Sequence, residues 1–300
     1  MSNKTEAVLV TGGSGFLGAE VCRQLIAAGQ RVIDVRHKAM PASDVISVSA
    51  DIANYQQLEA IFLEYKINAI IHMAATLTTN SNQNPDLAFR VNVLGSNNLL
   101  ELTRHYGINR FVYSSSYSAL GYRPIEECPV DETVAPTPCN FYGETKRFVE
   151  ALGVSYAQKF GFQFTAGRMG AVVGPGNSLS TSSWRMDIFN MLKTGGKIDT
   201  KFAPQVTLTI SLREDTARAL VTLALAEKVE HSIYNLPNDS LSLQQIADMV
   251  KTLRGDVEFF FGTTTEQDMP PLISAKRFTQ EFINFRHMPL AEALRLYQKS

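Results

Sequence analysis

The sequence lacks the features that define several protein classes. Its 300 residues include only three cysteines, Cys22, Cys128 and Cys139, and these have neither CxxC nor metal-ligand spacing. An odd number of cysteines without a pairing pattern is typical of a reduced intracellular protein, so we expect a cytoplasmic location. No apolar run reaches the ~18 residues of a membrane span. The short apolar run near the N-terminus ends in glycines rather than in a signal-peptide cleavage site, and we expect no membrane association.

The sequence also lacks an excess of positive or negative charge. The chain has 28 Lys and Arg against 29 Asp and Glu, a net charge of -1. Proteins that bind nucleic acid usually carry a basic patch, so no nucleic-acid partner is expected. Histidine and acidic residues never occur at metal-ligand spacing, and no metal site is predicted. Gly195-Gly196-Lys197 lacks the upstream glycine and the following Ser/Thr of a Walker loop.

Short apolar, β-branched runs alternate with amphipathic segments over the first 170 residues. This alternation predicts right-handed βαβ units and an α/β fold, a Rossmann-type doubly wound parallel sheet with helices on both faces. The expected strands are 7–11, 31–36, 45–49, 69–74, 111–115 and 164–169, and the expected helices are 16–28, 58–65, 87–105 and 141–160.

The alternation weakens after Gly174-Pro175-Gly176, where Thr, Ser and Met become frequent and their spacing irregular. A smaller C-terminal substrate-binding lobe is predicted from there. We assign 1–170 to a dinucleotide-binding domain to which 206–236 return, and 171–205 and 237–300 to the lobe. Further helices are expected at 217–225 and 243–253.

A glycine-rich stretch separates the first expected strand from the first expected helix. It fits both GxGxxG, from Gly13, and GxxGxxG, from Gly12. Such a loop needs glycine because the turn is tight, the backbone must approach a pyrophosphate and the helix must pack closely on the strand. The helix N-terminus then offers free N–H groups to the anion. The cofactor-binding residues predicted here are Gly12, Gly15, Phe16, Leu17 and Gly18.

The end of the second strand bears on the choice of dinucleotide. If the strand continues through Val35, Arg36 stands at its carboxyl end and Asp34 lies inside it. A guanidinium at that place suits the 2′-phosphate of NADP. In the alternative, Asp34 binds the adenosine ribose and the cofactor is NAD. We favour NADP.

A second motif supplies candidate catalytic residues. Tyr142 and Lys146 are four residues apart on one expected helix and share a face. A nearby ammonium lowers the pKa of a phenol, so the pair can exchange a proton with a substrate oxygen while a hydride moves at carbon. Ser114, Ser115 and Ser116 leave the carboxyl end of the preceding strand, where ligands bind in such sheets. The alternative is that Tyr142 and Lys146 form a surface pair without a catalytic role.

With these motifs in this order, the sequence resembles the extended short-chain dehydrogenase/reductase family over nearly its whole length. The resemblance implies that Ser116, Tyr142 and Lys146 are catalytic, and it implies a homodimer joined through the helices that hold Asn92 and Tyr142. The further cofactor contacts that it suggests are Asp51, Ile52, Ala74, Ala75, Asn92, Tyr142, Lys146 and Met169.

Substrate class is inferred mainly by exclusion. Nucleotide-sugar enzymes of this family hold a diphosphate with an Asn and usually two arginines, whereas ungapped alignment places Ala171 and Leu208 at two of these positions and no arginine within 263–267. An unpaired diphosphate would be costly to bury. We therefore expect a small hydroxy or keto substrate rather than a nucleotide sugar, in a pocket whose candidates are Thr76, Ser116, Ser118, Met169 and Trp184.

The central segment also resembles the short-chain L-threonine 3-dehydrogenases, at 65–67, 84–88 and 159–161. Those enzymes use NAD, which Arg36 disfavours, so we expect a substrate other than threonine. Two alternatives stay open. One is a nucleotide-sugar epimerase or dehydratase with tightly bound NAD(P), and the other is a non-catalytic dinucleotide sensor.

Overall fold

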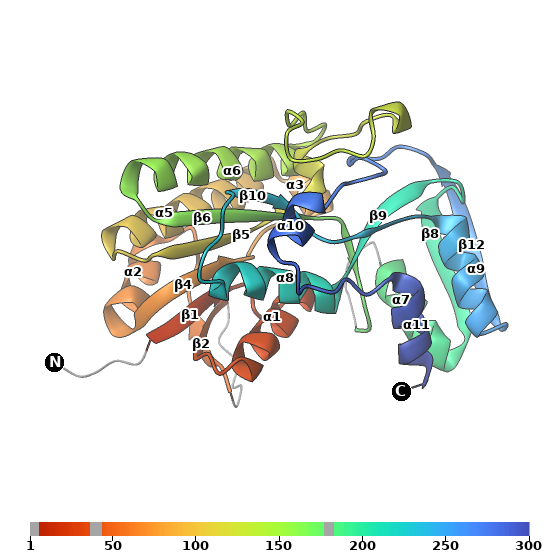
Figure 1. The fold of residues 1–300 in the computed structure, drawn as a ribbon, viewed down its shortest axis with the longest axis horizontal. Helices are drawn as coiled ribbons and strands as arrows, with labels where there is room; N and C mark the ends of the chain where they lie inside the picture. Colours follow the sequence, from red (N-terminus) through yellow and green to blue (C-terminus); the bar gives the residue numbers. More distant parts are fainter. Residues whose placement is uncertain (1–5, 37–43, 177–182, 300) are drawn as a thin grey trace.

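The computed structural model describes residues 6–36, 44–176 and 183–299, and its largest element is a seven-stranded parallel sheet (Figure 1). The strand order is β10-β6-β5-β4-β1-β2-β3, and every neighbouring pair runs parallel. This confirms the predicted α/β class. The strands are β1 Glu6–Thr11, β2 Val32–Arg36, β3 Ile46–Ser49, β4 Lys66–His72, β5 Arg110–Ser116, β6 Gln163–Met169 and β10 Ile233–Asn235.

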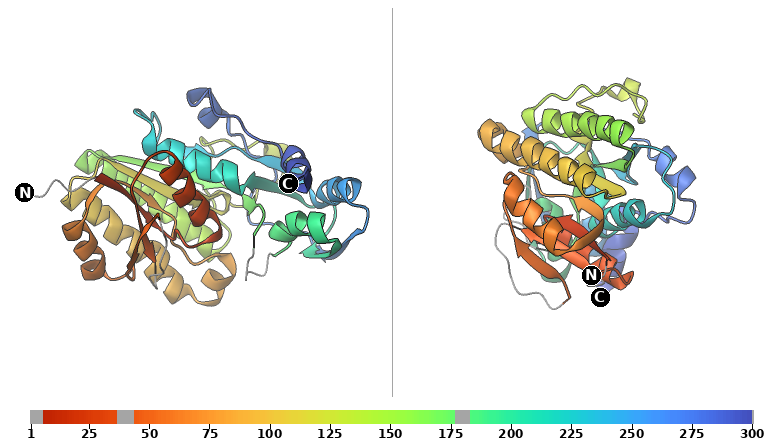
Figure 2. Two further views of the ribbon diagram at one scale, coloured as in Figure 1. Left: turned by 90° about the horizontal axis from the view of Figure 1, so that it is seen from below. Right: turned by 90° about the vertical axis from the view of Figure 1, so that its left-hand side faces the viewer.

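Helices cover both faces of this sheet (Figures 1 and 2). The helices are α1 Phe16–Ala27, α2 Tyr55–Glu64, α5 Gly95–His105, α6 Phe141–Phe160 and α8 Arg213–Leu225. Successive side chains of a strand point to opposite faces. Leu9 accordingly joins the core beneath α2, α5 and α6, while Val8 and Val10 join the core beneath α1 and α8.

The helix α6 has the predicted bounds because both of its ends are capped. Asn140 accepts a hydrogen bond from the Gly143 N–H at 2.8 Å, as an N-cap should. Gly161 ends the helix at φ 80°, a left-handed conformation that favours glycine.

The helix expected at 87–105 is divided. The short helix α3 Thr78–Gln83 precedes it, α4 Pro85–Ala88 overlaps its start, and Phe89–Leu94 form a π-helical turn before α5 begins. Such turns are frequent at functional sites because they insert an extra residue into the helix and redirect a side chain. Here the turn contains Asn92, which is buried.

The C-terminal part of the chain forms a second, smaller layer with its own apolar core (Figure 1). It contains a three-stranded sheet, β11-β9-β7, and a two-stranded sheet, β12-β8. Within 206–236, β9 joins the smaller sheet, whereas α8 packs on α1 and β10 extends the main sheet. The elements of this part are β7 Ala171–Val173, α7 Trp184–Thr194, β8 Gly196–Phe202, β9 Thr207–Leu212, β11 Asp239–Ser242, α9 Leu243–Leu253, β12 Val257–Thr264 and α11 Leu290–Lys299. The helix α10 Lys276–Glu281, which was expected to belong to the lobe, packs instead against β10 of the main sheet, and its Phe278 joins the core beneath α1 and α8.

His287 ties the two parts together. Its ring nitrogens lie 3.0 Å from the Asp215 carboxylate on α8 and 3.1 Å from that of Asp239 on β11. Burial alone would lower the pKa of His287, but the two carboxylates outweigh it and raise the pKa to about 9.

Among the described helices, none is both long and apolar enough to cross a membrane.

Candidate active site

The glycine loop has backbone geometry that other residues could not adopt. Gly12 has φ 77°, and a Cβ atom on it would lie 3.0 Å from the backbone nitrogen of Ala74. A Cβ on Gly18 would lie 2.1 Å from the Gly12 carbonyl oxygen. Gly15 then starts α1 without any side-chain cap and without an acidic residue in the first turn. The N–H groups of this helix end are therefore free to bind an anion, as a pyrophosphate cradle requires.

Asp34 holds this loop from inside the sheet. It is fully buried, and its Oδ1 accepts a hydrogen bond from the Gly13 N–H at 2.8 Å. Arg36 donates from Nε to the other carboxylate oxygen at 2.6 Å. A Cβ on Gly13 would lie 2.4 Å from the same carboxylate, so glycine is needed there too. Asp34 thus lies within β2, and Arg36 is the last residue of that strand. His37 and Lys38 lie outside the described residues.

His72 links the loop to the strand beside it. Thr11 Oγ1 accepts from the N–H groups of Met73 and Ala74, each at 3.1 Å, and lies 2.6 Å from His72 Nδ1. On the other side, His72 Nε2 lies 2.8 Å from Ser96 Oγ. Complete burial lowers the pKa of His72 to about 3, so the ring is neutral. These bonds explain why β4 ends at His72, two residues before the expected strand end.

The Asn92 side chain connects the π turn to α6 and to the loop after β4. Its Oδ1 accepts from the Thr76 N–H at 2.8 Å, and its Nδ2 donates to the Thr76 carbonyl at 3.1 Å and to Thr145 Oγ1 at 3.2 Å. Thr145 in turn donates to the Tyr142 carbonyl at 2.7 Å. Asn92 therefore fixes the first turn of α6 relative to Thr76, a predicted pocket residue.

The three predicted catalytic residues come together at the carboxyl end of β5. Lys146 Nζ donates to the Ser114 carbonyl at 2.7 Å and lies 5.6 Å from the centre of the Tyr142 ring. Ser116 ends β5 and accepts from the Ser118 N–H at 3.1 Å, and it also hydrogen-bonds Tyr142. All three side chains are buried, with Ser116 and Tyr142 each 8% exposed.

The electrostatics of this triad differ from the sequence expectation. Burial raises the pKa of Tyr142 to about 12, and the opposing effect of Ser116 is smaller. Burial also lowers the pKa of Lys146 to about 7, although the nearby Glu150 carboxylate raises it. The expected lowering of the phenol pKa by the ammonium does not set the value here, because loss of solvation dominates the pKa of both groups.

A buried ion pair lies directly behind Lys146. Glu150, one turn further along α6, accepts from Arg168 at 2.8 and 2.7 Å and from Ser115 Oγ at 2.5 Å. Arg168 and Glu150 are 3% and 4% exposed. This bidentate pair joins α6 to β6 and holds Ser115 beneath the triad.

Three polar residues that sequence reasoning did not select lie next to the triad. Asp268 Oδ2 accepts from Ser118 Oγ at 3.1 Å and from Asn140 Nδ2 at 2.9 Å. Asp268 also interacts electrostatically with Tyr142 and with Arg185 on α7. Nothing in the local sequence marks Asp268 or Arg185, because they come from segments far from Tyr142 in the chain. Asn140 is also the N-cap of α6.

The other predicted contacts lie around the same crevice. Phe16 stacks beneath Arg213, whose guanidinium carbon is 5.2 Å from the ring centre. Ile52 packs on Gly95, and Asp51 caps the turn that follows it, accepting from the Ala53 N–H at 2.9 Å. The remaining residues are less specific: Leu17 and Met169 are packed in the core beneath α1 and α8, Trp184 is packed in the lobe core, and Ala75 is half-buried.

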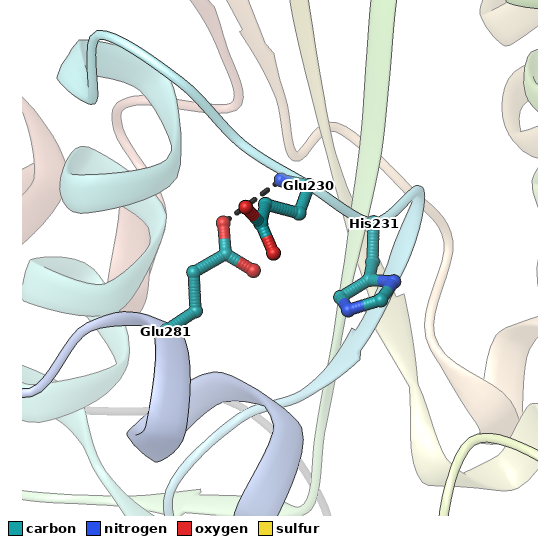
Figure 3. A group of neighbouring side chains, drawn as sticks. All are labelled: Glu230, His231 and Glu281. Atoms are coloured by element: carbon teal, nitrogen blue, oxygen red, sulfur yellow. Dashed lines mark hydrogen bonds between the residues drawn. The ribbon is translucent and has the colours of Figure 1, made fainter.

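Another group of ligand-type side chains is formed by Glu230, His231 and Glu281 (Figure 3). Sequence spacing does not reveal it, because Glu281 comes from α10. The two carboxylate oxygens of Glu281 already accept hydrogen bonds, at 2.8 Å from the Glu230 N–H and at 2.5 Å from the Tyr234 hydroxyl. These bonds fasten the turn before β10 to α10, and they account for the group without a metal.

Comparison with known proteins identifies the family. Residues 8–236 match the model of the NAD dependent epimerase/dehydratase family. The chain therefore belongs to this family of NAD-dependent enzymes, the class that the resemblance to extended short-chain dehydrogenases predicted.

Two groups of relatives match at similar levels. The chain is 32% identical to a UDP-glucose 4-epimerase of Halalkalibacterium halodurans over 53% of its length and 48% of the relative's. It is 26% identical to the mitochondrial L-threonine 3-dehydrogenase of Bos taurus, over 82% of this chain and 68% of that protein. The chain thus spans about half the length of several of the curated epimerases that it matches.

Solved structures show the same division. The UDP-glucose 4-epimerase of Thermus thermophilus in complex with NAD has a TM-score of 0.83 at 24% identity, covering 98% of both chains. The L-threonine dehydrogenase of Phytophthora infestans has a TM-score of 0.86 at 25% identity, again covering 98% of both chains. The fold is therefore shared by epimerases and dehydrogenases, and fold alone does not choose between them.

Proposed function

We propose that this protein is an NADP-dependent oxidoreductase that transfers a hydride reversibly between the nicotinamide and a small hydroxy or keto substrate that is not a nucleotide sugar. The observation that carries the proposal is the meeting of Ser116, Tyr142 and Lys146 in one buried site beside the glycine cradle. A protein that only binds a dinucleotide needs no such proton relay.

The residues of the cradle fit a dinucleotide. Gly12 and Gly18 leave room that a Cβ atom would fill, and the start of α1 supplies uncapped N–H groups for the pyrophosphate. When bound, the nicotinamide accepts or supplies the hydride. Asp51, Ile52, Ala74 and Asn92 complete the proposed cofactor contacts.

Each residue of the triad has a separate task in this proposal. Tyr142 exchanges a proton between its phenol oxygen and the substrate oxygen, and Ser116 Oγ hydrogen-bonds that same oxygen. Lys146, held by the Ser114 carbonyl, places its amino group beside the phenol, where its protonated form favours the phenolate. Because the site is buried, bulk water is kept from the proton that is transferred.

The preference for NADP rests on β2. Both Asp34 oxygens are already engaged, one by the Gly13 N–H and one by Arg36. Asp34 is therefore poorly placed to bind the ribose hydroxyls of NAD. Arg36 presents a guanidinium at the carboxyl end of the strand, where the 2′-phosphate of NADP lies in this class of fold.

Tyr142→Phe tests the central claim. We expect kcat for a panel of short alcohols, hydroxy acids and ketones to fall by about 10²–10⁴-fold, because the proton can no longer be exchanged. NADPH binding, measured by fluorescence titration, should be unchanged. Tyr122→Phe is the matched control, since Tyr122 is 48% exposed and should leave both quantities unaltered. Retained turnover in Tyr142→Phe would refute the assigned role.

A second candidate, a nucleotide-sugar epimerase, is favoured by the identity to UDP-glucose 4-epimerases. Against it, Ala171 and Leu208, which stand at the aligned positions of diphosphate-binding residues, are apolar and buried. A thermal-shift panel of UDP- and GDP-sugars separates the two, since strong stabilisation by any of them would favour the epimerase.

The proposal extends to assembly and location. Large apolar side chains are exposed on the π turn and on α6, notably Phe89 at 53%, Phe141 at 36% and Phe148 at 49%. These are the helices that the family resemblance assigns to a homodimer, and burial of such a face would favour association.

The three free cysteines suit a reducing compartment, and we propose a cytoplasmic location.

A further inference from the structure

Arg185 carries a guanidinium that has no carboxylate partner among the described residues. Arg185 occupies the first turn of α7, and its Nε is buried with no hydrogen-bond partner in the part of the chain that the structure describes. Nine arginines of the described chain form ion pairs with carboxylates, and Arg185, like Arg90 and Arg110, is not among them. Arg185 also interacts electrostatically with both Tyr142 and Asp268.

Burying an unpaired cation is unfavourable unless an anion accompanies it. Arg185 is half-buried as a residue, and loss of solvation lowers the pKa of its guanidinium. Asp268 favours the Arg185 charge electrostatically but forms no ion pair with it, and Asp268 Oδ2 accepts hydrogen bonds from Ser118 and Asn140 instead. The missing partner is therefore expected from a ligand.

The charges around Arg185 also limit which anion can bind. A single guanidinium forms a bidentate pair with one carboxylate, whereas a phosphate dianion would face the nearby Asp268 carboxylate with only one cation to offset it. The reacting oxygen must lie at Ser116 and Tyr142 in the same small site. The anion and the reacting carbon are hence expected within one short molecule.

We propose that Arg185 binds the carboxylate of the substrate, so that the substrate is a short-chain hydroxy acid or its oxo acid. This inference rests on the proposed function. In the oxidation direction the hydroxy acid would give its hydride to the oxidised nicotinamide and its hydroxyl proton to Tyr142, leaving the oxo acid. Arg185 takes no part in the bond changes and acts as a specificity-determining residue.

The test compares acids with their uncharged amides. Thermal shifts of the NADP-saturated protein are measured with lactate, glycerate and 3-hydroxybutyrate, with the three matching primary amides, and with glycerol phosphate. We expect at least one acid to stabilise the wild type, and its amide and glycerol phosphate to do so at least about tenfold more weakly in apparent affinity. Equal stabilisation by acid and amide, a preference for the phosphate, or no stabilisation by any acid overturns the inference.

Arg185→Gln and Arg185→Lys complete the test. We expect Arg185→Gln to weaken acid binding by about 30-fold or more and to leave amide binding unchanged, with Arg185→Lys intermediate because it keeps the charge and loses the fork. Lys193→Gln, the same charge change on the exposed end of α7, is the control and should bind the acids as the wild type does. Acid binding by Arg185→Gln at wild-type strength overturns the assignment.

A purely structural role for Arg185 has a different signature. Loss of an unpaired buried charge should leave the melting temperature of the unliganded protein equal or higher, whereas loss of a structural contact would lower it and weaken acids and amides alike. Failure of the proposed function is also distinguishable. If Tyr142→Phe keeps its turnover, hydride-transfer roles fail, while the binding comparison of acids and amides still decides the role of Arg185.

Discussion

At the scale of single residues, loss of solvation sets the pKa values of the two titratable residues of the active site. The phenol of Tyr142 and the ammonium of Lys146 are both driven toward their neutral forms, with pKa values of about 12 and about 7. A neutral phenol can donate a proton, whereas the phenolate that could accept one is present only in a small fraction. The two directions of the proposed reaction should therefore respond differently to pH.

We predict that kcat/KM for alcohol oxidation rises with pH between neutrality and pH ~10, by up to about tenfold per unit, because only the phenolate of Tyr142 can accept the proton. For carbonyl reduction the phenol form is needed. Since the raised pKa keeps Tyr142 protonated throughout this range, that direction should show no loss from phenol ionisation. Initial rates in both directions at constant ionic strength check this, and a flat oxidation profile above neutrality would contradict it.

At the scale of elements, the carboxyl end of β2 and the glycine loop act as one unit. Asp34 joins them by holding Gly13 on one oxygen and Arg36 on the other. In the proposed function this unit selects the cofactor, because the guanidinium that pairs with Asp34 stands at the strand end where a 2′-phosphate is recognised in this class of fold.

We predict that the wild type binds NADP more tightly than NAD, and that Arg36→Asp shifts this ratio toward NAD by about tenfold or more, since a phosphate then faces a carboxylate. Arg36→Gln provides a milder variant, because Arg36→Asp sets two carboxylates side by side. Arg31→Asp, just before the other end of β2, is the control and should leave the ratio unchanged. Titration with both dinucleotides measures it, and a large wild-type preference for NAD would be incompatible with the NADP assignment.

At the scale of the whole molecule, the exposed apolar face of the π turn and α6 is unusual for an isolated chain. Phe89 and Phe148 lie on the helices whose inner sides carry Asn92 and Tyr142. An interface there would therefore border the active site directly.

We predict a homodimer of about twice the 33.2 kDa chain mass, and dissociation to monomers in Phe148→Lys, because a buried, unpaired ammonium in an apolar interface is costly. Light scattering coupled to gel filtration measures the mass. Phe260→Lys is the matched control, since Phe260 is 44% exposed but lies on β12 of the smaller lobe. A monomeric wild type would refute the predicted assembly.

The parallel sheet, the glycine cradle and the helix of Tyr142 and Lys146 could all be predicted from the chain alone, because they depend on local patterns: apolar alternation, glycines at fixed spacing, and two side chains one turn apart. What surrounds them depends on tertiary contacts. Folding engages Asp34 with Gly13, places a neutral His72 between Thr11 and Ser96, and brings Asp268 and Arg185 to Tyr142 from distant segments. It also reverses the expected pKa shift of Tyr142, since desolvation depends on how deeply a group is buried and spacing along the chain carries no such information.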